Sequence, residues 1–205
     1  MKELLNKIEE LKKSDIGLLI NKRIDEFKTF KEKTNRSWFS ELCFCLMTAN
    51  WKAEESITLQ QELGHEGFCE MEQEKLSEFL KKKGHRFWPQ RAERIVLARQ
   101  HLDIKDILKN EKEPREWLVY NIKGLGYKEA SHFLRNVGYE DYAIVDFHIV
   151  DLLVKEGIIE KPKSLTKNKY LEIEQVLKAI GKKMSLSLAE LDLYLWYLET
   201  GKVLK

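Results

Sequence analysis

The sequence has few cysteines, the residues that form disulfide bonds and structural zinc sites. Its 205 residues include three cysteines, Cys43, Cys45 and Cys69, and no repeated C-x-x-C spacing. An odd count without that spacing argues against a disulfide framework and against a zinc site. Cys43 and Cys45 fall in an apolar helical stretch, and we interpret them as small core residues.

Long apolar runs are also missing. No stretch is long enough to span a bilayer. The opening stretch MKELLNKIEELKK is typical of an amphipathic charged helix and lacks the apolar core of a signal peptide, so we expect a cytoplasmic protein without membrane contact. With 43% apolar and 34% charged residues, the composition indicates a folded globular chain.

Strand signals are scarce, which predicts an all-α fold. Strict alternation of apolar and polar residues is rare, and no Asn-Gly hairpin signal occurs. Glycine and proline punctuate the helical segments, and Ser14 is a suitable N-cap. The helices we predict span residues 15–31, 37–49, 53–64, 73–82, 89–101, 103–109, 114–121, 127–137, 146–155, 167–182 and 186–199.

One stretch concentrates positive charge. Residues 81–99, KKKGHRFWPQRAERIVLAR, carry seven basic residues and one acid, so their net charge is 7 − 1 = +6. Phe87 and Trp88 lie inside the stretch. Basic residues interleaved with aromatic ones suit a surface that follows phosphates and inserts a side chain between bases. A solvated helix start would give the same pattern.

The stretch IKGLGYKEA, residues 122–130, places two glycines between helical segments. Glycine costs a helix about 1 kcal/mol relative to alanine, so the position indicates a turn. A helix, a turn containing Gly124 and Gly126, and a second helix form a helix-hairpin-helix motif. Such a turn lets the backbone approach a DNA phosphate, which the second helix meets with free N–H groups. Glycine is also the usual residue of purely structural turns.

A lysine and an aspartate follow this turn. Lys128 lies at the start of the second helix, where the helix dipole disfavours a cation and so favours a nucleophilic amine. Asp146 lies eighteen residues later in AIVDFHIV. It is placed to cap the following helix, and a carboxylate there is also suited to assist the lysine and to stabilise a positive sugar centre. The combination is more specific than any of its parts.

IKGLGYKEA followed by VDFHI resembles the signature of the helix-hairpin-helix DNA glycosylases. Over residues 35–205 the chain is most similar to the archaeal-type 8-oxoguanine DNA glycosylase/AP lyases. Its last residues, LYLWYLETGKVLK, resemble the C-terminal end of those proteins. The resemblance implies base-excision repair of double-stranded DNA containing oxidised guanine, by base flipping, attack of Lys128 at C1′ and Schiff-base β-elimination. Asp146 would be the essential carboxylate. No cysteine follows Cys69, so no iron–sulfur cluster is expected.

The resemblance also implies the contacts with DNA and with an ion. LMTANW makes Asn50 the contact to the estranged base, and FWPQRAERI makes Phe87 the intercalating side chain, with Arg91 beside it. His148 would contact a phosphate. The remaining expected contacts are those of Gly124, Gly126 and Lys123 with the DNA backbone, and those of the carbonyls of Tyr120, Ile122 and Leu125 with a sodium or potassium ion. Lys123 stands where the family often has proline.

Recognition of the base is expected from three residues. His132 lies one helical turn after Lys128 and faces the same cleft. Trp196 is placed to stack on a flipped purine, although core packing would explain it as well. The carboxylate of Lys205 would accept a hydrogen bond from N7–H of 8-oxoguanine, unless the tail is merely solvated.

Two helical lobes with a DNA-binding cleft are expected. The first lobe covers about residues 32–113 and carries the gap-filling and wedge loops. The second, about 1–31 plus 114–205, carries the hairpin, the catalytic residues and the last helix. A monomer that requires no cofactor is expected. Two alternatives stay open, a glycosylase of this fold for another damaged base and a non-catalytic DNA-binding module.

Overall fold

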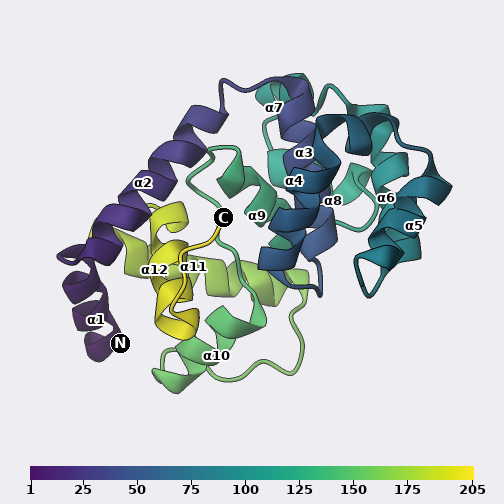
Figure 1. Cartoon of the computed structure of the whole chain (residues 1–205). Coiled ribbons are helices and arrows are strands. Elements are labelled where there is room, and N and C mark those ends of the chain that lie inside the picture. Colours follow the sequence, from purple (N-terminus) through teal and green to yellow (C-terminus); the bar gives the residue numbers. More distant parts are fainter. The chain divides into compact units, whose positions relative to one another are not determined.

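The fold is all-α, as predicted. The computed structural model describes all 205 residues, which form twelve α-helices and one short 3₁₀ helix without any strand (Figure 1). None of the helices is long and apolar enough to cross a lipid bilayer. The chain divides into two compact units, Glu32–Phe133 and Met1–Lys31 with Leu134–Lys205.

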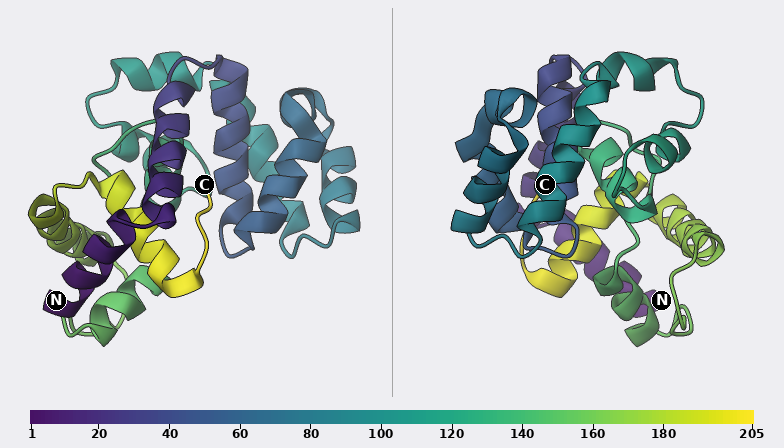
Figure 2. Two further views of the ribbon diagram at one scale, coloured as in Figure 1. Left: turned by 60° about the vertical axis from the view of Figure 1, so that its left-hand side comes forward. Right: turned by 90° about the vertical axis from the view of Figure 1, so that its right-hand side faces the viewer.

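The unit Glu32–Phe133 is built around one buried helix. Helix α3 (Asn35–Thr48) is buried from Trp38 to Thr48, because apolar residues dominate this part of its sequence and its buried Glu41 accepts a hydrogen bond from Gln60 at 3.1 Å. The other helices of this unit are α4 (Ala53–Glu70), α5 (Gln73–Lys82), α6 (Trp88–Ala98), η1 (Arg99–His101), α7 (Ile104–Asn110), α8 (Pro114–Asn121) and the first part of α9 (Tyr127–Asn136). Helices α4, α6 and α7 contact α3, and α5 packs beside α6 (Figures 1 and 2).

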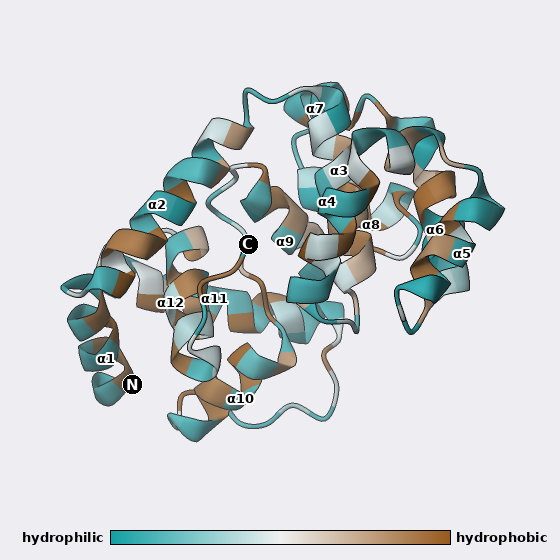
Figure 3. Cartoon of the chain, viewed as in Figure 1, coloured by the Kyte–Doolittle hydropathy of each residue, from teal (hydrophilic) through white to brown (hydrophobic).

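The other unit joins the two ends of the chain. Helices α1 (Lys2–Lys12) and α2 (Asp15–Phe30) pack with α11 (Lys167–Met184) and α12 (Leu188–Thr200), and α10 (Phe147–Lys155) packs on α12. Hydrophilic (teal) and hydrophobic (brown) residues alternate along α1 and α2, as expected of amphipathic helices (Figure 3). Ser14 and Ser187 cap α2 and α12 with their hydroxyl groups, so the predicted cap at Ser14 is confirmed.

One predicted helix end is confirmed and two details differ from the sequence-based prediction. Gly64 adopts a non-helical conformation, with a φ of 60° and a ψ of −171°, so the helix that begins at Ala53 closes there as expected, and a second helical segment of α4 follows across the kink to Glu70. The helix expected over 89–101 ends at Ala98 and tightens into η1. Residues 114–133 group with the first unit, since Lys123 pairs with Glu93 of α6 at 2.7 Å and the rings of Trp117 and His101 lie 5.1 Å apart.

A buried ion pair ties α9 to α12. Arg135, in the last turn of α9, donates from its guanidinium to Asp192 of α12, and the two residues are 4% and 8% exposed. The same guanidinium donates to Asn136 Oδ1 at 3.0 and 3.1 Å and lies 5.1 Å from the ring centre of Phe27. These contacts satisfy a charge that would otherwise be costly to bury.

Removal of Asp192 should therefore be strongly destabilising. We expect Asp192→Ala to lower the free energy of unfolding by about 3–5 kcal/mol, because it leaves the Arg135 charge buried without its carboxylate. Urea unfolding followed by circular dichroism measures this change. Asp151→Ala is the control, since its pair with Lys161 is exposed and contributes below about 1 kcal/mol. Equal losses in the two variants would contradict the expectation.

Candidate active site

The turn between α8 and α9 requires glycine at one of its two glycine positions. Gly124 has a φ of 98°, and a Cβ atom there would lie 2.5 Å from Cδ of Arg94. Gly126 has no such restriction, because its φ is not positive and a Cβ would approach no atom closer than 3.4 Å. Its carbonyl accepts the first helical hydrogen bond of α9, from Ala130 N at 2.9 Å. Gly124 therefore sets the turn, and Gly126 begins the helix.

Lys128 lies in the first turn of α9, as predicted. Its side chain is 27% exposed, and its Nζ lies 3.6 Å from Oε1 of the neighbouring Glu129. His132 follows one turn later on the same helix, 8% exposed, with its ring 5.7 Å from that of Phe44 in an edge-on arrangement. Because Lys128 and His132 are four residues apart, the partly accessible amine and the largely buried imidazole lie on the same face of α9.

Asp146 caps α10. Its Oδ1 accepts a hydrogen bond from Ile149 N at 3.0 Å, and its backbone is extended. Capping uses one oxygen of the carboxylate, so it fixes the orientation of the group and does not exclude a chemical role for Oδ2. The capping reading of the sequence is thereby confirmed, while the chemical role stays a prediction.

Aromatic rings gather beside Asp146 in the same unit. The ring of His148 lies 4.1 Å from that of Phe147 and 5.0 Å from that of Trp196, edge-on to the latter. Phe147 is 68% exposed, and Trp196 is neither fully buried nor fully exposed. The structure therefore brings Asp146, His148 and Trp196 together, and Trp196 is not a plain core residue.

Asn50 follows the end of α3 in a left-handed conformation. It is exposed with a φ of 58°, a region that asparagine adopts more readily than most residues other than glycine. The neighbouring Ala49 offers its carbonyl to the guanidinium of Arg91. The role of Asn50 as a DNA contact stays a prediction.

His85, which the sequence analysis did not single out, joins the two loops expected to enter DNA. Its Nδ1 accepts from Phe87 N at 3.2 Å, so Nε2 carries the proton and donates to Met47 O at 3.1 Å. The ring stacks on Trp51 at 4.8 Å. His85 thus connects the end of α3 with the start of α6, and no sequence signal for this contact exists beyond its position in the basic stretch.

The basic stretch 81–99 is only partly a surface. Arg91 is 3% exposed, and burial lowers the pKa of its guanidinium to about 10. It donates inward to Ala49, where the sequence analysis expected a DNA contact. Arg99 likewise donates to the carbonyls of Phe68 and Met71. Both arginines thus supply donors to backbone carbonyls near helix ends, which have no partner within the helix.

The remaining predicted residues lie as follows. Lys123 is exposed, and Tyr120 is 89% exposed. The carbonyl of Ile122 accepts from Leu125 N at 3.1 Å, which leaves it one lone pair for a cation. Lys205 ends a tail without regular structure and is partly exposed.

Comparison with known proteins identifies the class. The Ogg-HhH family model, described as 8-oxoguanine DNA glycosylase, matches residues 20–186. The 8-oxoguanine DNA glycosylase/AP lyases of Methanocaldococcus jannaschii and Korarchaeum cryptofilum are 58% and 48% identical to the chain; the matches cover 98% and 99% of this chain and 99% and 98% of those proteins.

A solved structure agrees with this class. The crystal structure of the Methanocaldococcus jannaschii 8-oxoguanine glycosylase/lyase with a 15mer DNA containing 8-oxoguanine has a TM-score of 0.96 and 56% identity, over 99% of this chain and all of that one. The chain belongs to the 8-oxoguanine DNA glycosylase family of helix-hairpin-helix proteins.

The contacts of His85 generate a pH prediction. Burial lowers the pKa of His85, an effect that nearby Arg91 reinforces and that the Met47 carbonyl and Glu55 oppose. The unfolded chain therefore binds the proton at higher pH than the folded one, and stability is lost as the pH falls through the ordinary histidine range. We expect the melting temperature to drop between about pH 7.5 and about pH 5.5, and to drop less in His85→Gln.

His101 provides the matched comparison, because burial also lowers its pKa. His101→Gln should remove its own share of the pH dependence and leave the share of His85. An identical pH dependence in wild type and His85→Gln would show that the His85 ring does not titrate differently on unfolding.

Proposed function

We propose that this chain removes 8-oxoguanine from double-stranded DNA and then cleaves the strand, with Lys128 as the nucleophile and Asp146 as the assisting carboxylate. Family membership supports the glycosylase and AP lyase activities. The observation that carries the residue assignment is the place of Lys128, whose partly exposed amine begins α9 directly behind the turn that Gly124 sets.

The chemistry follows from an amine at a sugar carbon. Nζ of Lys128 attacks C1′ of the flipped nucleotide, the bond from C1′ to the base breaks, and the base leaves with the bonding pair and takes up a proton. Opening of the sugar ring then gives a Schiff base between Nζ and C1′. Loss of a proton from C2′ expels the 3′ phosphate and breaks the strand. Oδ2 of Asp146 stabilises the positive charge that develops on the sugar.

The remaining predicted residues bind and distinguish the DNA. The backbone at Gly124 and Gly126, with Lys123, and the start of α9 receive a phosphate, and His148 receives another. Asn50 and Phe87 fill the space left by the flipped base. Arg91 takes part indirectly, by holding the loop of Asn50. We assign recognition of the flipped base to His132, Trp196 and the Lys205 carboxylate.

A monovalent cation fits the hairpin. The carbonyls of Tyr120, Ile122 and Leu125 are neutral oxygen donors of the kind that sodium and potassium accept, and Ile122 keeps one lone pair for this purpose. Such an ion would supply positive charge next to a DNA phosphate. The chemistry at Lys128 needs no cofactor. We further propose a monomer that acts on chromosomal DNA in the cytoplasm.

Replacement of Lys128 tests the assignment directly. Borohydride should cross-link the wild-type protein to DNA containing 8-oxoguanine, and Lys128→Gln should form no cross-link and release no base. Asp146→Asn keeps the cap on α10, and we expect it to bind the lesion while its turnover falls by several orders of magnitude. Full-rate excision by Lys128→Gln would end the nucleophile assignment. If borohydride cross-linked the protein only to DNA with another damaged base, the proposed substrate would be wrong, but the role of Lys128 as nucleophile would stand.

Extension of the C-terminus tests the base pocket. A carboxylate facing N7–H of 8-oxoguanine gains a charge-assisted hydrogen bond of roughly 1.5–3 kcal/mol, whereas guanine presents a lone pair there. Two or three residues added after Lys205 should therefore reduce 8-oxoguanine excision about 10- to 100-fold. Cleavage at a preformed abasic site, which needs no base recognition, is the control and should persist. Unchanged excision by the extended protein would assign the tail to solvent.

A further inference from the structure

The segment that carries Asp146 has no secondary structure of its own. Residues 137–146 connect α9 to α10 without a helix, so their backbone groups need other partners. Ala143, Ile144 and Val145 are all at most 7% exposed, so bulk solvent does not reach their backbone groups. Ala143 and Val145 find hydrogen-bond partners in side chains instead.

Two buried side chains of α11 hold this segment. Tyr170 donates from its hydroxyl to Ala143 O at 2.6 Å and accepts from Val145 N at 3.2 Å. Glu174 accepts from Ala143 N at 3.0 Å through Oε2. Both side chains lie one helical turn apart, both residues are 2% exposed, and Lys178 Nζ lies 3.7 Å from the other oxygen of Glu174.

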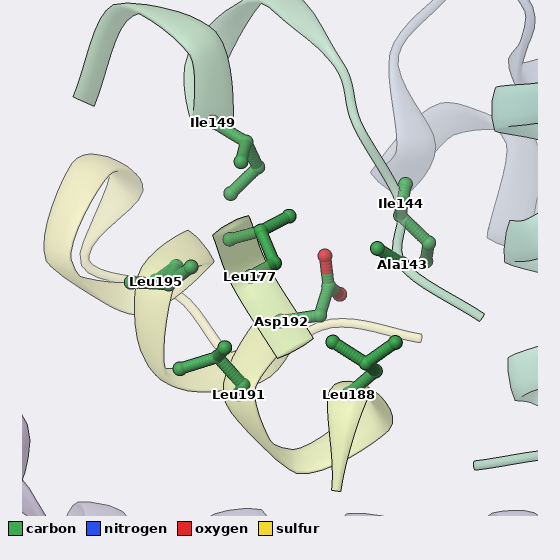
Figure 4. A pocket seen from close by; sticks show the side chains of 8 residues that line it. All are labelled: Ala143, Ile144, Ile149, Leu177, Leu188, Leu191, Asp192 and Leu195. Atoms are coloured by element: carbon green, nitrogen blue, oxygen red, sulfur yellow. The ribbon is translucent and has the colours of Figure 1, made fainter. Parts of the chain in front are cut away.

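Apolar side chains surround the segment as well. Ala143 and Ile144 border a small pocket whose other walls come from α10, α11 and α12, among them Leu177 and Asp192 (Figure 4). Apolar contacts are not directional, whereas hydrogen bonds are. The three hydrogen bonds from α11 therefore set the orientation of the backbone within this apolar surrounding.

We propose that Tyr170 and Glu174 are positioning residues that hold Asp146 for catalysis, an inference that rests on the role proposed for Asp146. The bond from Val145 N to Tyr170 holds the chain before Asp146. After it, the carboxylate caps Ile149 N and the Asp146 carbonyl accepts from Val150 N at 3.0 Å. Loss of the bond to Tyr170 lets the carboxylate move by a fraction of an ångström to about 1 Å. A displacement of that size costs on the order of 100-fold in rate.

Tyr170→Phe is the central variant, because it removes the hydroxyl and keeps the ring. We expect single-turnover excision of 8-oxoguanine to slow by about 10- to 100-fold, with unchanged affinity for the lesion DNA. Tyr194→Phe is the matched control. Tyr194 is also 2% exposed and lies on α12 of the same unit, and its hydroxyl forms no hydrogen bond with residues 143–145. Its rate should stay within about twofold of wild type.

Glu174 supplies a second, independent pair of variants. Glu174→Gln keeps an oxygen for Ala143 N and should excise at nearly the wild-type rate. Glu174→Met fills similar space without an acceptor and should slow excision as Tyr170→Phe does. Rates are compared well below each melting temperature, so that loss of folded protein does not mimic loss of rate. Equal rates of Glu174→Gln and Glu174→Met would overturn the role of Glu174.

A double-mutant cycle separates this inference from the proposed function. If Tyr170 acts through Asp146, Tyr170→Phe slows the wild-type enzyme but has no further effect in the Asp146→Asn background. An equal slowing in both backgrounds would overturn the inference and leave the role of Asp146 intact. Full activity of Asp146→Asn alone would instead overturn the proposed role of Asp146, and the inference with it. A wild-type rate in Tyr170→Phe would overturn the inference alone.

Discussion

The conformation of the chain around α9 is the constraint on which the site depends. This one helix begins at the turn that Gly124 makes possible and ends at the buried pair of Arg135 with Asp192. At its start, residue 124 has a φ of 98°, a conformation that residues with a side chain rarely adopt, so the turn favours glycine. At its end, a buried charge demands its partner. Between the two, Lys128 and His132 take fixed places on one face.

The non-helical parts of the chain follow a common plan. Two segments that carry a predicted functional residue, those of Asn50 and Asp146, are held by buried polar side chains from elsewhere in the chain. Arg91 and His85 hold the carbonyls around Asn50, and Tyr170 and Glu174 hold the residues before Asp146. Buried backbone groups outside helices must find partners, and the partners then determine where the functional side chain lies. The residues that hold these segments are thus different from the residues predicted to contact DNA or to take part in the chemistry.

Charge alone does not tell which basic residues of the stretch 81–99 lie at the surface. Arg91 and Arg99 belong to this stretch of net charge +6, yet both donate to main-chain carbonyls inside the unit. Lys81, Lys82 and Lys83 of the same stretch are exposed. An arginine at a helix end serves equally well as a phosphate contact or as a partner for terminal carbonyls, and its surroundings decide between them.

The sequence by itself determined the helical class, most helix boundaries, the hairpin, and the positions of Lys128 and Asp146, because periodicity, caps and turn glycines are local properties. It also indicated the family through short motifs. Only the tertiary structure decided that Gly124 and not Gly126 is required, that Arg91 faces inward, and that His85, Tyr170 and Glu174 support the site. Those outcomes depend on contacts between residues far apart in the chain, such as Tyr170 with Ala143. Local sequence carries no record of such contacts, since burial and hydrogen-bond partners arise only when helices pack together.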